Sequence, residues 1–252
     1  MKIGLQLFTV RREAKKELHG TLKKVNALGL RYVEAARIDF SEENAKIFQR
    51  AKEDFGLEVV STQIKFNILK DEFEKVLTFH KMTDCKIAVI SVLPVKNIFG
   101  GQKELLEFCK EANALSEKYN KEGIELCFHH HDFEFLIREY GMQIDILRKS
   151  LNIPFVIDTY WATKAGFPAD ILTKTLPKVK GYHLRDYGLK GAARKAKDFA
   201  LGDGVIDFKR IIESGLNSVE YAVIEQNTTR PFEELKKSVD HIKKLGYEEL
   251  LK

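Results

Sequence analysis

Apolar and polar positions alternate with a regular rhythm along the whole chain. Short apolar runs recur about every 30 residues, and a longer stretch with apolar residues at helical spacing follows each of them. The apolar runs begin near Ile3, Arg31, Leu57, Lys86, Ile124, Pro154, Gly181 and Ala222. Strand-like and helix-like segments that alternate in this way are typical of βα units in a parallel sheet. Because the near-regular repeats favour closure over an open sheet, we predict a (β/α)8 TIM barrel.

The helical stretches carry recognisable signals at their ends. Ser41 and Gly56 bracket one stretch, and Pro231 and Gly246 bracket the last one. The last stretch places an apolar stripe at helical spacing, made of Phe232, Leu235, Val239, Ile242 and Leu245. Since no Ser-rich or Pro-rich linker interrupts the chain, we expect residues 1–252 to form a single domain.

Length and charge narrow the functional classes. A chain of 252 residues with 44% hydrophobic content matches the length of such a barrel, about 250 residues. The 42 basic and 37 acidic residues are interspersed and give a formal charge of +5, which is typical of a solvated Lys-rich surface rather than a nucleic-acid interface. The first apolar stretch is too short for a signal peptide, and no apolar run has the length of a membrane span. We expect a cytoplasmic protein without a nucleic-acid or membrane partner, and a homo-oligomer stays possible.

Three apolar runs in the second half of the chain end in a charged or ionisable residue. Asp158 follows Phe155–Ile157, Glu225 follows Val223 and Ile224, and His183 lies inside its run. In a TIM barrel the active site lies at the C-terminal ends of the strands. A buried carboxylate is costly there unless it is paired or bound to a metal. Each residue alone could be a cap or a structural hydrogen-bonding group, but their occurrence on consecutive strands favours a site.

The segment His129–Glu134 (HHHDFE) is the densest polar stretch of the chain. Alternation along an extended segment points His129 and His131 in one direction, where they could bind substrate hydroxyls or move protons near neutral pH. An all-histidine metal site is the alternative, although adjacent histidines point to opposite faces. Glu134 lies just beyond the strand, where a turn could bring its carboxylate back toward the axis. Together with the three residues above, it would give an oxygen-rich site for one divalent cation, formed by Glu134, Asp158, His183 and Glu225.

Other polar or aromatic residues flank the ends of the predicted strands. We expect a substrate-binding role for His129, Glu34, Gln63, Trp161 and Arg11. A sugar hydroxyl would bind the polar members, and Trp161 would pack against the apolar face of a sugar ring.

At these residues the chain resembles the sugar phosphate isomerase/epimerase family of xylose isomerase-like TIM barrels. The resemblance runs from end to end. It is carried by the segments Lys2–Arg11 (KIGLQLFTVR), Phe128–Phe135 (FHHHDFEF), Ile157–Trp161 (IDTYW), Tyr182–Tyr187 (YHLRDY), Ala200–Phe208 (ALGDGVIDF) and Val223–Arg230 (VIEQNTTR).

The resemblance implies one divalent metal ion, Mn, Co, Mg or Zn, held by Glu134, Asp158, His183 and Glu225. In epimerase relatives the first of these ligands lies within the strand, nearer the position of Phe128, a residue that cannot bind metal. The implied reaction is proton abstraction α to the carbonyl of a small sugar or polyol, with Glu225, Glu134 or His131 moving the proton.

The family resemblance leaves the type of reaction open. Isomerisation or epimerisation is the first interpretation. Loss of a β-substituent from a keto-sugar, keto-glycoside or keto-inositol on the same site would instead make the protein a dehydratase or lyase. Two further alternatives are a non-catalytic sugar-binding barrel and a phosphodiesterase like the apurinic endonucleases. The endonuclease needs more histidine ligands, and the first four predicted strands end without one.

Overall fold

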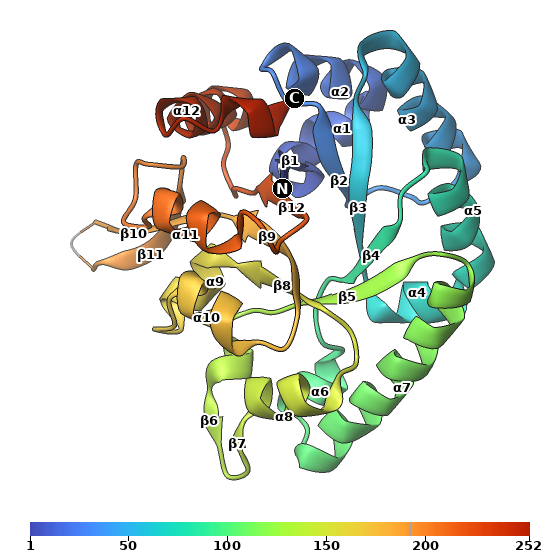
Figure 1. Cartoon of the computed structure of the whole chain (residues 1–252), viewed down its shortest axis with the longest axis vertical. Helices are drawn as coiled ribbons and strands as arrows, with labels where there is room; N and C mark the ends of the chain where they lie inside the picture. Colours follow the sequence, from blue (N-terminus) through green and yellow to red (C-terminus); the bar gives the residue numbers. More distant parts are fainter. Residues whose placement is uncertain (192) are drawn as a thin grey trace.

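The computed structural model describes residues 1–191 and 193–252. Its centre is a closed barrel of parallel strands in the order β1-β12-β9-β8-β5-β4-β3-β2 (Figure 1). The strands are β1 (Lys2–Gln6), β2 (Tyr32–Ala36), β3 (Glu58–Ile64), β4 (Ile87–Ile90), β5 (Glu125–His129), β8 (Phe155–Asp158), β9 (Val179–Leu184) and β12 (Tyr221–Ile224). Each overlaps or directly follows the start of one of the predicted apolar runs, so the prediction of a TIM barrel is confirmed.

Helices connect successive strands and cover the outside of the barrel. They are α1 (Arg11–Lys16), α2 (Leu18–Ala27), α3 (Glu42–Phe55), α4 (Phe66–Asp71), α5 (Phe73–Thr83), α6 (Val95–Phe99), α7 (Gln102–Lys121), α8 (Gln143–Ser150), α9 (Thr159–Lys164), α10 (Ala169–Thr175), α11 (Phe208–Gly215) and α12 (Pro231–Lys244). Short 3-10 helices are η1 (Leu7–Val10), η2 (Phe133–Phe135) and η3 (Glu248–Leu251). None of the described helices combines the length and the apolar character that a membrane span needs.

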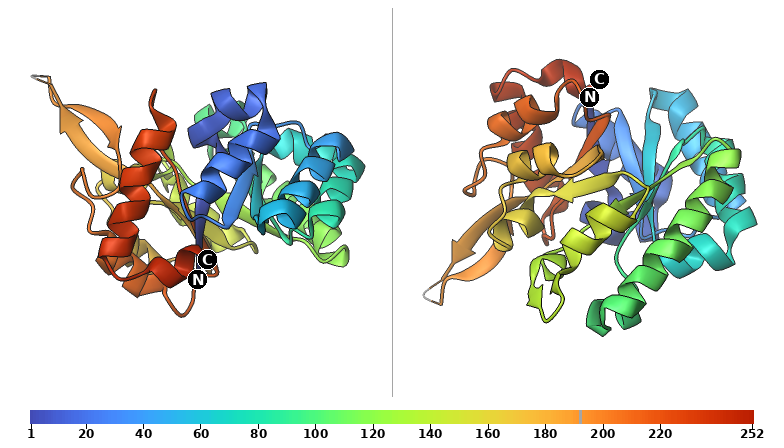
Figure 2. Two further views of the ribbon diagram at one scale, coloured as in Figure 1. Left: turned by 90° about the horizontal axis from the view of Figure 1, so that it is seen from above. Right: turned by 60° about the horizontal axis from the view of Figure 1, so that its bottom comes forward.

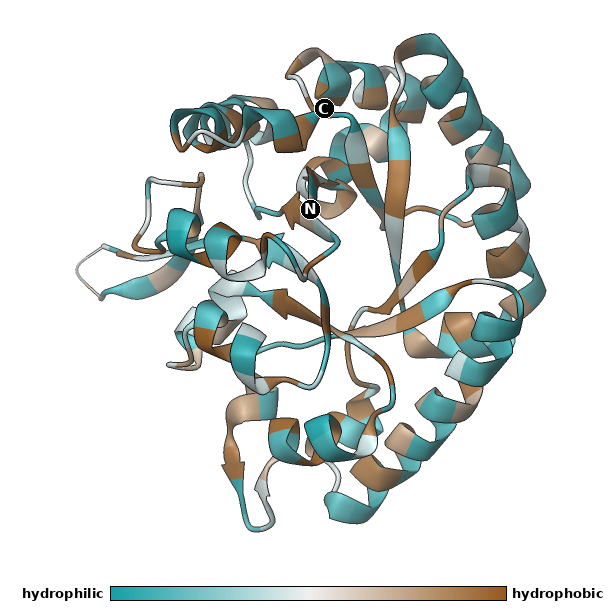
Figure 3. Cartoon of the chain, viewed as in Figure 1, coloured by the Kyte–Doolittle hydropathy of each residue, from teal (hydrophilic) through white to brown (hydrophobic). Residues whose placement is uncertain are grey.

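The helix ends follow the signals in the sequence. The Ser41 hydroxyl accepts a hydrogen bond from the N–H of Asn44 at the start of α3, and Gly56 ends this helix with φ of 70°. A positive φ favours glycine because it has no Cβ. Pro231 occupies the first turn of α12, where its missing N–H costs no helical hydrogen bond. Figure 3 shows that apolar residues are concentrated on the barrel strands and hydrophilic residues on the long helices.

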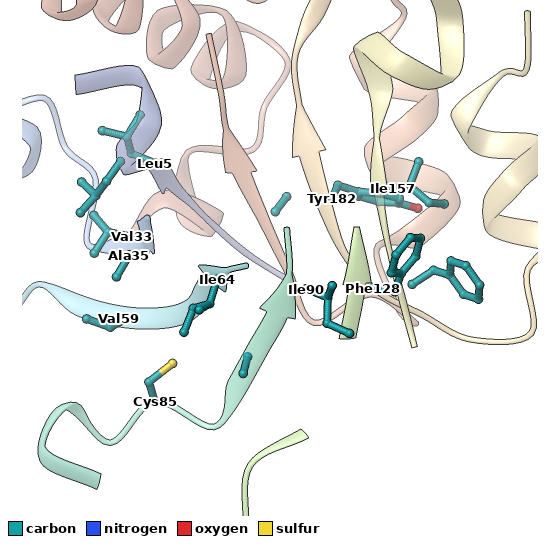
Figure 4. Close-up of a cluster of buried hydrophobic side chains, with 14 of the residues drawn as sticks. Leu5, Val33, Ala35, Val59, Ile64, Cys85, Ile90, Phe128, Ile157 and Tyr182 are labelled. Atoms are coloured by element: carbon teal, nitrogen blue, oxygen red, sulfur yellow. The ribbon is translucent and has the colours of Figure 1, made fainter. Parts of the chain in front are cut away.

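Two buried layers explain how the strands present their side chains. An outer layer between barrel and helices includes Phe128, Ile157 and Tyr182, which Figure 4 shows on β5, β8 and β9. A smaller cluster consists of Ile87, Val89, Cys127, Val156, Tyr221 and Val223. Because successive side chains of a strand point to opposite faces, these residues face the barrel interior. On β5, β8 and β12, the residue two positions after the last member of this cluster also faces inward and lies at or directly after the C-terminal end of the strand.

Two hairpins interrupt the βα pattern in the second half of the chain. β6 (Ile137–Arg138) pairs with β7 (Gly141–Met142), and β10 (Asp186–Lys190) pairs with β11 (Lys195–Phe199). The β10–β11 hairpin projects from the body of the barrel (Figure 2). It begins immediately after β9, and its second strand contributes residues to the cavity described below.

Candidate metal centre

Four ionisable side chains meet inside the C-terminal end of the barrel. His129 follows Phe128, Asp158 follows Ile157 and His183 follows Tyr182, so all three point inward by alternation. Glu225 comes directly after β12, and its N–H donates to the Leu184 carbonyl at 3.0 Å. Potential ligand atoms of His129, Asp158, His183 and Glu225 all lie within 4.8 Å of one another, and all four residues are buried. We call these four residues the ligand cluster.

His183 connects two carboxylates. Its Nδ1 is hydrogen-bonded to Glu225 Oε2 at 2.7 Å, and its Nε2 lies 2.8 Å from Glu34 Oε1. Burial by itself would lower the pKa of His183, but the two carboxylates outweigh it and raise the pKa to about 10. In this state His183 is an imidazolium. A metal ion would have to displace one of its protons, so binding would release a proton.

The imidazole of His129, unlike that of His183, forms no hydrogen bond with the described residues. Both ring nitrogens are buried without a hydrogen-bond partner among the described residues, and Nε2 lies 3.5 Å from Asp158 Oδ2. A buried nitrogen without a partner costs about 1–3 kcal/mol. Two imidazoles and two carboxylates are a donor set that suits Zn, Mn or Co, with Mg the poorest match. The residues present therefore fit a divalent cation.

Asp158 both ends β8 and starts α9. Its Oδ1 accepts a hydrogen bond from the Trp161 N–H at 2.9 Å, which caps the helix, while Oδ2 faces His129 and Arg185. Burial alone would raise the pKa of this carboxyl, but the charge of Arg185 and the contacts with His129 hold it well below its ordinary value. Asp158 is thus an anion in the barrel interior.

Arg185 is a charged member of the site that sequence reasoning missed. Its Nη1 lies 3.4 Å from Asp158 Oδ2 and 3.2 Å from Glu225 Oε1, and its other end pairs with Asp198 of β11. A signal was available, because Arg185 lies two residues after His183 and alternation points both side chains the same way. No comparable signal marked Asp198, which lies on an inserted hairpin.

A cavity of about 790 Å³ opens at this end of the barrel. His129, Glu225 and Arg185 line its part next to the ligand cluster. The remaining wall mixes apolar and polar side chains, among them Phe8, Arg37, Gln63, Lys65, His131, Tyr160, Trp161 and Asn227. Such a volume accommodates a small polar metabolite.

The sequence matches the family described as Xylose isomerase-like TIM barrel over residues 22–245. The chain belongs to this family. No curated protein matches its sequence significantly. Its fold is similar to that of a sugar phosphate isomerase/epimerase from Parabacteroides distasonis, with 20% identity, a TM-score of 0.79, and coverage of 100% of this chain and 95% of the other.

Two further solved structures are similar in fold. One is the probable 3-DHS dehydratase AsbF from Bacillus anthracis, with 13% identity, a TM-score of 0.76, and coverage of 96% of this chain and 99% of the other. The other is the IOLI protein, whose crystal structure holds a zinc atom, with 13% identity, a TM-score of 0.69, and coverage of 100% and 98%. At these identities the similarity establishes the fold.

In this family member Glu134 lies apart from the ligand cluster. The β5 strand ends at His129, and η2 turns the Glu134 carboxylate back onto the chain, where Oε2 accepts a hydrogen bond from the His131 N–H at 2.7 Å. Burial raises the pKa of Glu134 to about 8. The structure thus brings three of the four predicted ligands together and adds His129, for which the sequence predicts a substrate-binding role.

Only some of the predicted substrate-binding residues line the cavity. Gln63 and Trp161 line the cavity, as does His131, whose ring lies 5.4 Å from that of Trp161. Arg11 donates hydrogen bonds to the Phe8 carbonyl and the Asn227 side chain, two residues of the wall. Glu34 is fully buried behind the ligand cluster and contacts His183.

Proposed function

We propose that this barrel is a metal-dependent isomerase or epimerase of a small sugar or polyol, acting by proton abstraction α to a carbonyl. The observation that carries the proposal is the ligand cluster of His129, Asp158, His183 and Glu225 beside a polar cavity of about 790 Å³. The family membership and the isomerase/epimerase fold neighbour support it.

The ligand cluster would hold one divalent cation, Mn, Co, Zn or Mg. His129 replaces Glu134 as the proposed fourth ligand, because its nitrogens are buried without partners in the described part of the chain. A bound cation would polarise the carbonyl and stabilise the enediolate formed by loss of the α-proton. Glu34, whose Oε1 lies 2.8 Å from His183 Nε2, would keep His183 in place, as a neighbouring carboxylate commonly does for a ligating histidine.

Glu225 is the group that we assign to proton transfer. It lines the cavity, and its pKa lies below the ordinary value because Arg185 and His183 outweigh the effect of burial. Glu225 is therefore a carboxylate that can accept a proton from a bound substrate. His131 is the second proton-transfer candidate at the cavity wall. Burial and the neighbouring His129 lower its pKa well below the ordinary value, which leaves the ring neutral.

The remaining wall offers contacts that suit a sugar. Trp161 and Phe8 provide aromatic surface for the apolar face of a ring, and Gln63 and Asn227 provide amides for hydroxyl groups. Nδ1 of His131 is buried without a partner in residues 1–191 and 193–252, so a substrate hydroxyl can bind there.

Exchange of substrate hydrogen with solvent tests this function. The Mn-loaded protein is incubated in D2O with a panel of ketoses, keto-glycosides and keto-inositols, and NMR follows replacement of C–H by C–D. We expect exchange that disappears on addition of a chelator. The product identifies the reaction, since an epimer or isomer supports the proposal and an unsaturated product indicates a dehydratase or lyase. Stoichiometric metal without exchange for any panel member would contradict it.

A further inference from the structure

Arg185 places a permanent positive charge beside the ligand cluster. It directly follows β9, and alternation points it toward the barrel interior together with His183. Only 8% of its side chain is exposed, and this residue lines the cavity. A guanidinium buried to this extent needs acceptors for its N–H groups.

One end of the guanidinium is held firmly by the inserted hairpin. Nε and Nη2 donate to the two carboxylate oxygens of Asp198 on β11 at 2.9 and 3.1 Å. This paired geometry is the strong form of an arginine–carboxylate contact. The rings of Tyr160 and Trp161 lie 4.7 and 5.2 Å from the guanidinium carbon, which further limits its movement.

The other end is held loosely by two members of the ligand cluster. Nη1 lies 3.4 Å from Asp158 Oδ2 and 3.2 Å from Glu225 Oε1, and both distances exceed those usual for a charged hydrogen bond. A divalent cation bound to the ligand cluster would be coordinated by the same two carboxylates. The N–H groups of Nη1 would then have weaker acceptors, on a residue that lines the cavity.

We propose that Arg185 is a catalytic residue whose Nη1 binds the carbonyl oxygen of the substrate and stabilises the negative charge that develops there, and that Asp198 is the positioning residue that aims it. The inference rests on the proposed function and names the substrate as an α-hydroxycarbonyl compound. Arg185 keeps its proton throughout, so it donates hydrogen bonds without competing for the proton that Glu225 accepts. A fixed donor in a site of low dielectric is worth far more than the same donor in water.

The charge of Arg185 distinguishes a catalytic role from a purely structural one. Arg185 repels a second cation while it would attract an anionic oxygen. Removing its charge should therefore strengthen metal binding and weaken the binding of an anionic ligand. A residue that merely holds Asp158 and Glu225 in place would give weaker metal binding when it is removed.

The test measures two affinities for each variant. Calorimetry gives the affinity for Mn²⁺ alone, and then the affinity of the Mn-loaded protein for acetohydroxamate, a planar chelator with two neighbouring oxygens like an enediolate. For Arg185→Met we expect Mn²⁺ binding about tenfold tighter and acetohydroxamate binding at least about tenfold weaker. Arg148→Met, which removes an exposed arginine paired with Asp145 on α8, serves as the control and should change neither.

Two further variants keep the test sharp if Arg185→Met unfolds, which circular dichroism would reveal. Arg185→Lys retains the charge but cannot form the paired contact, so Mn²⁺ affinity should stay near wild type and acetohydroxamate affinity should fall. Asp198→Asn should likewise weaken acetohydroxamate binding by roughly threefold or more and leave Mn²⁺ affinity no weaker. Weaker Mn²⁺ binding in Arg185→Met or Asp198→Asn, or unchanged acetohydroxamate binding in any folded variant of Arg185 or Asp198, would overturn the inference.

Failure of the proposed function gives a different result. If no sugar in the panel exchanges hydrogen but the two affinities still move in opposite directions, the role of Arg185 as an oxyanion donor stands and the assigned reaction fails. If wild type catalyses exchange and Arg185→Met exchanges at the same rate, the inference fails and the function stands. With both correct, Arg185→Met should slow exchange by about 100-fold or more.

Discussion

Both halves of the barrel carry inward-facing polar side chains, but the two sets differ in how far their hydrogen bonds are satisfied within the protein. On β1–β3 these side chains bind one another. Gln6 donates to Gln63 at 2.8 Å, and Glu34 Oε2 accepts hydrogen bonds from Ser61 and from Tyr221 of β12. On β5, β8 and β9, His129 has no hydrogen-bond partner among the described residues, and Asp158 faces two cationic or ionisable neighbours.

This difference separates a half whose polar side chains largely bind one another from a half that offers groups without partners to a ligand. Buried polar groups that satisfy one another add little reactivity, whereas buried groups without partners destabilise the fold and persist where a ligand can satisfy them. The contact between Glu34 and His183, at 2.8 Å, joins the two halves. Through this contact the first half can hold His183 in place. We therefore expect mutations in the second half to affect metal binding and catalysis directly, and mutations in the first half to affect metal binding indirectly or stability alone.

The largest effect is expected in the second half, at Glu225. Glu225→Gln keeps the size of the side chain but removes the charge and the ability to accept a proton. Solvent exchange should slow by about 1000-fold or more, measured by NMR in D2O. Glu125→Gln is a matched control, because Glu125 starts β5 at the opposite end of the barrel and pairs with Lys178 and Lys180. Exchange that survives in Glu225→Gln would contradict the assigned role.

The next prediction concerns the fourth ligand. His129→Ala should weaken Mn²⁺ binding by about 100-fold, the effect expected from loss of a direct ligand or its close support. Glu134→Gln should leave Mn²⁺ binding unchanged, since a Gln oxygen can still accept the hydrogen bond from the His131 N–H. The opposite ranking in a calorimetric titration would restore Glu134 as the ligand and exclude His129.

How much of this site the sequence could predict depends on the element that carries each residue. The hydrophobic rhythm located all the barrel strands, and Asp158, His183 and Glu225 stand out because each interrupts or ends a buried strand. Glu134 could not be placed in this way. It lies beyond the last residue of β5, and the 3-10 turn of η2 decides where its carboxylate goes. Short-range patterns do not fix the path of such a turn.

The contribution of the β10–β11 hairpin to the site could not be predicted from the sequence either. Asp198 reaches Arg185 because β11 pairs with β10 and returns to the barrel, and Asp186 supports this segment by accepting hydrogen bonds from the backbone of Gly202, Gly204 and Ile206. The contact between Arg185 and Asp198 depends on tertiary packing rather than on periodicity. Only the position of Arg185, two residues after His183, could have suggested its role.

A smaller effect is expected at Glu34, where the first half supports the second. Glu34→Gln would remove the negative charge next to His183 Nε2 and should weaken Mn²⁺ binding by about 10- to 100-fold without abolishing it. Ser61→Ala removes one hydrogen bond to Glu34 Oε2 and should give a reduction of the same sign but only a few-fold. Unchanged Mn²⁺ affinity in Glu34→Gln, measured by calorimetry, would show that the two halves act independently.

The smallest effect lies in the first half and concerns stability alone. His80 of α5 contacts the Cys85 carbonyl through Nδ1 and the Thr62 hydroxyl through Nε2, at 2.9 and 2.8 Å. Burial lowers its pKa to about 4, below the value of about 6.5 in an unfolded chain. The unfolded state therefore binds the proton more readily, and the stability present above pH 6.5 is lost as the pH falls toward 4.

Urea unfolding at pH 7 and pH 5 measures this loss. In wild type, His80 should account for about 2 kcal/mol of the decrease in the free energy of unfolding between these values. His80→Gln should be less stable at pH 7, because its hydrogen bonds are imperfect replacements, but its decrease toward pH 5 should be smaller by about the same 2 kcal/mol. The difference between the two proteins isolates His80, since buried His130 titrates in both. Equal decreases would mean that His80 has no abnormal pKa, and that other groups account for the pH dependence.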